Sequence, residues 1–277
     1  MKKSLFQFRD FTVEYAVIGE GNHPVIALHG FNRPLEDMAL LQTLLDENEF
    51  MVSIHLFHQG ASVIDPSRSL EDGVPVSELA ELFFAIAMEM GSSTFSLFGY
   101  SLGGRVCLSV YELAHASIPK MILFAPDGLY KNPFYQWAIH SRMGRSTFNW
   151  ILNHQQPVLK LVDFVRWCTL IPAKLHRFVH VHMGEERSEA ERWKIYNSWQ
   201  TYKFCFPNLA EVAKSLRDSK TKFHLVMGRH DSVIKYKYAQ NLLGPLGTDQ
   251  PLITIDAGHI LLTPEIIAFA KQQIARS

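Results

Sequence analysis

The chain has 277 residues, of which 47% are apolar and 19% are charged, and its 27 Lys and Arg balance 27 Asp and Glu. This composition is typical of a globular protein, and the length allows one large core with an insertion. The balanced charge excludes the basic excess of most nucleic-acid-binding proteins, so we expect no nucleic-acid partner.

The cysteines and the N-terminal residues indicate the cellular compartment in which the protein is expected. Cys107, Cys168 and Cys205 are widely spaced, show no metal-ligand spacing and lie in apolar surroundings, which predicts reduced core residues. The N-terminus starts with lysines, but Arg9 and Asp10 interrupt it before an apolar stretch of signal-peptide length. No run of about 20 apolar residues occurs. We therefore expect a cytoplasmic protein without an integral membrane segment.

The first half of the chain alternates strand and helix patterns. Alternating apolar residues over 8–18 predict one or two edge strands, closed by a Gly-rich turn. Residues 24–28 form a continuous apolar run, typical of a strand buried on both faces of a parallel sheet. A helix is predicted over 35–45, a strand over 50–54, and an amphipathic helix over 76–90 that ends at Gly91.

The second half continues this alternation after a long interruption. Strands are predicted over 94–98, 120–125, 222–227 and 252–255, and helices over 208–216, 236–243 and 264–274. Alternating strands and helices predict an α/β fold with a mostly parallel central sheet flanked by helices.

A Gly-x-Ser-x-Gly pentapeptide, Gly99 to Gly103, lies between the strand at 94–98 and an apolar segment with helical spacing. This pattern predicts a strand, a tight turn and a helix, with the Ser101 hydroxyl projecting from the turn. A serine at a helix N-terminus faces backbone N–H groups that favour developing negative charge. For the pentapeptide alone, the alternative is a Gly-rich turn between two buried elements.

Three further motifs extend this pattern: Leu28-His29-Gly30-Phe31, Met227-Gly228-Arg229-His230-Asp231 and Ala257-Gly258-His259. Together with the pentapeptide they make the chain resemble the α/β-hydrolase family over nearly its whole length. The resemblance implies an α/β-hydrolase fold whose core comprises residues 1–127 and 207–277. Residues 128–206 would then be an inserted helical lid.

The resemblance also implies a catalytic triad in the chain order Ser, Asp, His. Ser101, Asp231 and His259 meet this order, and each follows a predicted strand. Ser101 would be the nucleophile, His259 would take its proton, and Asp231 would orient the imidazole. Asp127 is an alternative acid, because some members of the superfamily place the acid one strand earlier; it is otherwise a turn residue in Pro-Asp-Gly.

By the same resemblance, the backbone N–H groups of Phe31 and Leu102 would form an oxyanion hole, and Phe31 and Tyr100 would contact substrate. A serine at this position argues against the haloalkane dehalogenases and epoxide hydrolases, which use aspartate. The implied function is hydrolysis of an ester or related acyl bond of a small molecule, without a metal or organic cofactor. Acyl transfer, C–C bond hydrolysis and a non-catalytic hydrolase-like binding module stay open as alternatives.

Two segments differ from a simple member of that family. Where the family often has Asp-x-x-Gly-x-Gly-x-Ser, His55 and His58 replace the acid and the first glycine, while Gly60 and Ser62 are kept. Both histidines are interpreted as hydrogen-bonded loop residues, with a functional role as the alternative.

The segment 128–206 contains all five tryptophans, and eleven Lys or Arg against five Asp or Glu. Its aromatic side chains either pack a helical layer beneath solvated basic groups, or form an acyl pocket whose positive charge attracts anionic substrates. The oligomeric state cannot be predicted from the sequence.

Overall fold

A computed structural model describes residues 1–168, 176, 180 and 188–276. The chain divides into two compact units: unit 1 comprises Met1–Ser69, Val74–Tyr130 and Phe204–Ser277, and unit 2 comprises Leu70–Gly73 and Lys131–Lys203. The expected boundaries, after residues 127 and 206, lie three residues from these divisions. Of the residues that the lid hypothesis uses, Lys174, Arg177, Phe178 and 185–187 lie outside the described residues.

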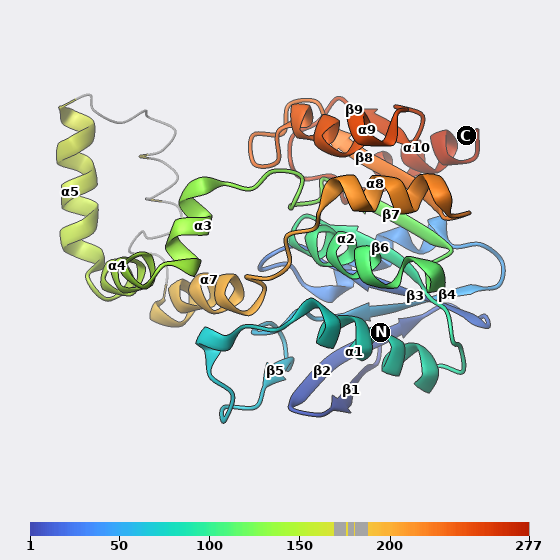
Figure 1. The fold of residues 1–277 in the computed structure, drawn as a ribbon, viewed down its shortest axis with the longest axis horizontal. Coiled ribbons are helices and arrows are strands. Elements are labelled where there is room, and N and C mark those ends of the chain that lie inside the picture. Colours follow the sequence, from blue (N-terminus) through green and yellow to red (C-terminus); the bar gives the residue numbers. More distant parts are fainter. Residues whose placement is uncertain (169–175, 177–179, 181–187, 277) are drawn as a thin grey trace. The chain divides into compact units, whose positions relative to one another are not determined.

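Unit 1 is built on one sheet, whose strands run in the order β1-β2-β4-β3-β6-β7-β8-β9, with β5 paired to β2 (Figure 1). The described strands are β1 Lys3–Phe8, β2 Phe11–Ile18, β3 His23–Leu28, β4 Glu49–Ile54, β5 Val63–Ile64, β6 Ser96–Tyr100, β7 Lys120–Phe124, β8 Lys222–Gly228 and β9 Leu252–Ile255. From β4 to β9 each neighbouring pair is parallel, whereas β1, β2 and β5 add antiparallel pairs at one edge.

Continuous apolar runs form the strands at the centre of the sheet, as expected for strands covered on both faces. Every residue of β4, β6 and β7 is buried. Strand β1 was not predicted, because its residues alternate between exposed and partly exposed and it is an edge strand, paired with β2. The mostly parallel α/β sheet predicted from the sequence is confirmed.

Helices cover both faces of this sheet. In unit 1 they are η1 Leu35–Leu44, α1 Val76–Glu89, α2 Leu102–Ala114, η3 His115–Ser117, α8 Leu209–Asp218, η4 Tyr236–Ala239, α9 Gln240–Leu246 and α10 Pro264–Ile274. Helices α1, α2 and α8 pack together on one face, and η1 packs with α10 on the other. Alternate strand residues such as Phe98, Ile122 and Val226 therefore share a core with Met38 of η1 and Ile267 of α10.

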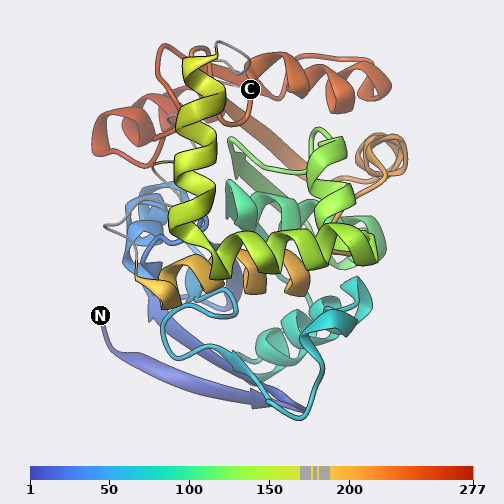
Figure 2. The same ribbon diagram turned by 90° about the vertical axis from the view of Figure 1, so that its left-hand side faces the viewer.

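Unit 2 is helical in its described part. Its elements are η2 Leu70–Asp72, α3 Pro133–His140, α4 Arg142–Asn153, α5 Gln155–Trp167 and α7 Glu189–Thr201. Helix α7 lies beside α4 (Figure 2), and a small core joins Leu152, Leu159 and Tyr196. Ser188 caps α7 in a reciprocal capping box with Glu191, which satisfies backbone donors at this helix start. Among the helices described in either unit, none combines the length and apolarity that crossing a bilayer requires.

A buried ion pair lies at the amino ends of the strands in unit 1. The Lys120 ammonium group bonds to Glu49, and its Nζ lies 3.0 Å from the Asp46 carboxylate. Lys120 and Glu49 are only 6% and 8% exposed. Burying two charges is tolerated only when they are paired, because either one alone would lose its hydration without compensation.

We therefore expect Lys120→Met to lower the free energy of unfolding by about 3 to 5 kcal/mol, since it leaves Glu49 buried and unpaired. Adding Glu49→Gln to this variant should recover much of the loss. Urea unfolding measures both effects. Lys222→Met, at the exposed lysine opposite Lys120 on β8, is the matched control and should change stability little. A loss no larger than that of the control would contradict this account.

Candidate active site

The turn between β6 and α2 holds Ser101 in a backbone conformation that side chains rarely adopt, with φ 52° and ψ −114°. Three backbone hydrogen bonds fix it: Ser101 donates to the Phe124 carbonyl at 3.0 Å, and its own carbonyl accepts from Asp127 at 2.8 Å and Arg105 at 3.2 Å. A residue in such a conformation persists only where its surroundings determine it. The turn therefore holds the Ser101 side chain at the carboxyl end of β6.

The glycines around Ser101 allow the helix to start against the sheet. A Cβ on Gly103 would lie 2.2 Å from the Leu28 carbonyl oxygen, and one on Gly104 would lie 2.5 Å from Pro126 Cβ. Both distances are far below van der Waals contact, so a side chain at either position would push α2 away from the ends of β3 and β7. The sequence pattern is thus explained by the close approach of backbone segments.

Ser101, His259 and Asp231 form one hydrogen-bonded chain within unit 1. His259 Nε2 lies 3.1 Å from Ser101 Oγ, and His259 Nδ1 lies 2.7 Å from Asp231 Oδ2. The three residues follow β6, β8 and β9, whose carboxyl ends share one edge of the sheet. The structure thus brings together three side chains that the sequence separates by up to 158 positions.

The carboxylate of Asp231 is fully enclosed and well satisfied. Its side chain has no exposed surface, and Oδ1 accepts from the backbone N–H groups of Val233 at 2.7 Å and Ile234 at 2.9 Å. The ionised carboxylate is a pure acceptor, so we assign the His259 proton to Nδ1. The unprotonated Nε2 is then free to accept a proton from the Ser101 hydroxyl.

Tyr100 supports His259 from the side. Its phenol donates to the His259 carbonyl at 2.9 Å, and the two ring centroids lie 5.4 Å apart. Tyr100 is 4% exposed, and burial raises its pKa to about 12, so it is a hydrogen-bond donor at neutral pH. The Tyr100 hydroxyl thus bonds to the backbone of His259, and its expected contact with substrate stays a prediction.

Asp127, the alternative acid, has different partners. Its Oδ2 lies 3.3 Å from Arg105 Nη1, and its Oδ1 accepts from the backbone N–H of Gly128 at 2.8 Å. Arg105 is 2% exposed, and its guanidinium lies 4.8 Å from the centroid of the Phe206 ring. The carboxylate hydrogen-bonded to His259 belongs to Asp231, so Asp127 neutralises a buried arginine in the turn after β7.

The loop after β3 lies against Ser101. A Cβ on Gly30 would lie 3.2 Å from Ser101 Cβ and 3.0 Å from Tyr100 Cδ1, so this position suits glycine. Over the described ranges, the backbone N–H groups of Phe31 and Leu102 donate to no protein acceptor. Both groups are therefore available to an acceptor from outside the chain, although the oxyanion hole they would form stays a prediction.

His29 anchors this loop from inside the core. It is fully buried, its Nδ1 donates to the Gly30 carbonyl at 2.7 Å, and its Nε2 accepts from the Leu56 backbone N–H at 3.1 Å. Burial lowers the pKa of His29 to about 4, although the hydrogen bond to Gly30 opposes this shift. His29 is therefore neutral near pH 7, and its ring ties the loop at Gly30 to the segment after β4.

His55 forms a second tie, and its partner is a residue that the sequence did not suggest. Its Nδ1 donates to the Glu14 carboxylate on β2, and its Nε2 accepts from the Leu35 N–H at 3.1 Å. Gly60 has φ 54°, and a Cβ there would lie 1.9 Å from His55 Nδ1. The interpretation of His55 as a hydrogen-bonded loop residue agrees with these contacts.

His58, at the position of the family's first glycine, has a left-handed backbone with φ 66°. Its backbone N–H donates to the Ser62 carbonyl at 3.0 Å, and burial lowers the pKa of its side chain to about 4. A left-handed conformation explains why glycine is common at this position, because glycine adopts it without steric cost.

A cavity of about 560 Å³ lies at the amino ends of the strands. Its lining includes Lys120 and Lys222, which start β7 and β8, together with His224 and Lys271. The triad occupies the carboxyl ends of the strands. This cavity therefore belongs to a different part of unit 1.

Comparison with known proteins shows a shared fold, whereas the sequence similarity is low. No protein-family model matches the sequence. The dihydrolipoyllysine-residue acetyltransferase component of an acetoin cleaving system from Pseudomonas putida is 29% identical over 111 residues, which are 40% of this chain. The matched part spans only 29% of that curated relative.

Solved structures match over the whole chain. A carboxylesterase of Nitrososphaera gargenis is 12% identical with a TM-score of 0.66, covering 99% of this chain and 98% of its own. MGS-M2, an α/β hydrolase from a Medee basin deep-sea metagenome, is 14% identical with a TM-score of 0.66, covering 99% and 96%. The esterase EaEST of Exiguobacterium antarcticum is 15% identical with a TM-score of 0.60, covering 99% of both chains.

The neutral state of His29 predicts a loss of stability in acid. A histidine whose pKa is about 4 in the folded chain and about 6.5 in the unfolded chain binds fewer protons when folded, so stability falls as the pH drops from 6.5 to 4. The shift corresponds to about 3 kcal/mol for this buried side chain.

Urea unfolding at several pH values measures this contribution as the difference between the wild type and His29→Gln, which does not titrate. The wild type should lose more stability on acidification than the variant. The pH titration of the His29 ring by NMR provides a second measurement that does not need the variant. Equal pH dependence of the two proteins, with a His29 pKa near 6.5, would contradict the account.

Proposed function

We propose that this chain, which has the α/β-hydrolase fold, is a serine hydrolase that cleaves an ester or related acyl bond of a small-molecule substrate. The observation that carries the proposal is the hydrogen-bonded chain from Ser101 through His259 to Asp231. A serine hydroxyl is a weak nucleophile at neutral pH, and an adjacent oriented base overcomes this weakness. Solved esterase structures with the same fold support the proposed class.

In the first half of the proposed reaction, Ser101 Oγ attacks the substrate carbonyl carbon while His259 Nε2 takes its proton. Asp231 stabilises the imidazolium that forms, without itself taking the proton. The negative charge on the former carbonyl oxygen would face the N–H groups of Phe31 and Leu102. Collapse of this tetrahedral intermediate breaks the bond to the leaving group, which receives the proton from His259, and leaves an acyl ester on Ser101.

In the second half, water attacks the acyl ester and passes a proton to His259. The bond to Ser101 Oγ then breaks, the hydroxyl regains its proton, and the carboxylic acid leaves. Removing one oxyanion donor costs about 2.7 to 4 kcal/mol of transition-state stabilisation in enzymes of this kind, which explains why a turn would hold Leu102 in place. The mechanism uses groups of this chain and one water molecule.

Acyl transfer is the second candidate, because the name of the Pseudomonas putida relative includes an acetyltransferase. The same acyl ester on Ser101 would then be attacked by an alcohol, amine or thiol in place of water. Product analysis with and without such acceptors separates the two candidates, since a transferase forms the transfer product at the expense of the free acid. Two alternatives stay open. C–C bond hydrolysis would use the same triad, and a non-catalytic binding module would not use it.

The proposal extends to the role of unit 2 and to the cellular compartment of the protein. We assign to unit 2 the role of a helical lid, since its long segment, Lys131–Lys203, is inserted between β7 and β8, as lids are in the family that the chain resembles. The positive charge of the inserted segment would favour anionic substrates.

Three unpaired cysteines support a reducing compartment, the cytoplasm.

Labelling by a fluorophosphonate probe tests the nucleophile. We expect the wild type to be labelled once, and Ser101→Ala to lose labelling completely because the reacting oxygen is removed. Ser109→Ala, on the same helix, is the control, since the Ser109 hydroxyl donates to the Arg105 carbonyl and its loss should not affect labelling. Folded wild type that stays unlabelled would favour the binding module.

Replacing Asp231 and Asp127 one at a time by asparagine tests which carboxylate orients His259. Asp231→Asn should lower kcat for p-nitrophenyl butyrate by on the order of 10⁴-fold, because an amide at this position favours the wrong imidazole tautomer. Asp127→Asn should lower kcat far less, as Asp127 bonds to Arg105 and Gly128. Steady-state kinetics measure both. The reverse order of effects would assign the acid to Asp127 and contradict our assignment.

A further inference from the structure

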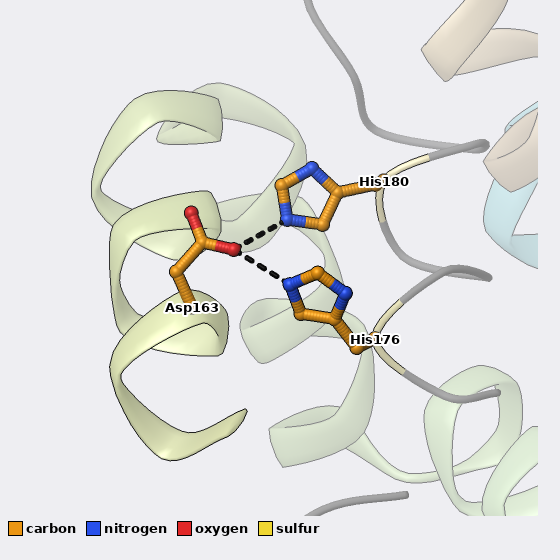
Figure 3. A group of neighbouring side chains, drawn as sticks. All are labelled: Asp163, His176 and His180. Atoms are coloured by element: carbon orange, nitrogen blue, oxygen red, sulfur yellow. Dashed lines mark hydrogen bonds and ion pairs between the residues drawn. The ribbon is translucent and has the colours of Figure 1, made fainter. Parts of the chain in front are cut away.

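One cluster of potential metal ligands lies within unit 2 and shares no residue with the proposed triad. Asp163 on α5 faces the imidazoles of His176 and His180 (Figure 3). Both Nε2 atoms lie 2.7 Å from the same carboxylate oxygen, Asp163 Oδ1. The two rings lie side by side, with centroids 4.4 Å apart. Three ligand-type side chains from two parts of the chain therefore converge on one point.

The chemistry of this set is specific. Two imidazole nitrogens and one carboxylate oxygen are ligands that zinc accepts, in a set like the His₂Glu sites of zinc enzymes. Hard cations such as Mg²⁺ and Ca²⁺ prefer oxygen ligands alone, so two histidines disfavour them. The spacing of His176 and His180, three residues between two histidines, also occurs in zinc sites. We propose that Asp163, His176 and His180 bind one Zn²⁺ ion in unit 2.

The two distances between imidazole nitrogen and carboxylate oxygen require only a small adjustment. The potential ligand atoms all lie within 4.8 Å of one another. Ligands placed about 2.0 to 2.2 Å from zinc in a tetrahedron are roughly 3.3 Å apart, so each imidazole would move by roughly half an ångström from the carboxylate oxygen. The side chains are 31%, 35% and 53% exposed for His176, His180 and Asp163, which leaves them room to move and lets water fill the fourth position.

Zinc would replace a weak interaction by a strong one. Hydrogen bonds from His176 and then His180 lower the pKa of the Asp163 carboxyl. Because all three groups are partly exposed, such ion pairs contribute little to stability. A divalent ion bonded to the same atoms would join His176 and His180 to Asp163 on α5. The site would therefore have a structural role in unit 2, independent of the proposed hydrolase activity.

Zinc titration of the untagged, chelator-treated 277-residue chain by calorimetry near neutral pH tests the proposal. We expect one Zn²⁺ ion per chain. His176→Ala, His180→Ala and Asp163→Asn should each weaken binding by more than the roughly 10- to 100-fold that loss of an outer-shell partner costs at metal sites. Thermal unfolding gives a second readout: zinc should raise the Tm of the wild type and not that of the variants.

Two histidines outside the cluster are matched controls. His154 lies in unit 2 and contacts Trp150. His230 in unit 1 pairs with Asp256, and among the described residues this pair has no third ligand within reach. His154→Ala and His230→Ala should bind zinc as the wild type does, and Mg²⁺ should show no binding at the same concentrations. Absence of zinc binding by the wild type, or binding unchanged in the three cluster variants, would overturn the proposal.

Discussion

The strained turn at Ser101 is the constraint on which the rest of unit 1 depends. A left-handed residue between a strand and a helix requires small neighbours, because α2 then starts in direct contact with the end of β3. The hydrogen bond from Ser101 to the Phe124 carbonyl fixes the turn to β7, the next strand of the sheet. Parallel strands bring the residues after β8 and β9 to the same edge. The order of the strands thus decides which side chains can meet.

A second set of contacts supports the loop beside that turn. His29 and His55 each use both ring nitrogens, and together they join the loop at Gly30 and Leu35 to the segment after β4. Neutral imidazoles suit this purpose, because each offers one donor and one acceptor in a fixed direction. These contacts hold the backbone of the loop whose Gly30 lies against Ser101.

The sequence predicted the sheet and the three residues of the proposed triad, because both rest on local patterns: apolar runs, a glycine-flanked serine, and polar residues directly after strands. It did not predict the strand at Lys3–Phe8, which has one exposed side and lies at the edge of the sheet, paired with β2. Nor did it suggest Glu14 as the partner of His55, since 41 residues separate them and only the pairing of β2 with β4 brings them together. The spacing of His176 and His180 was a readable signal, but Asp163 lies 13 residues earlier on another element.

The most direct measurement of the central claim is the mass of the acyl-enzyme. The wild type is mixed with p-nitrophenyl butyrate, quenched in acid within the first turnover, and digested for peptide mass spectrometry. Our account predicts a butyryl group on the peptide that contains Ser101, at that residue, and its absence after the ester has been consumed. Ester hydrolysis without an adduct at Ser101, or with the adduct on another side chain, would contradict it.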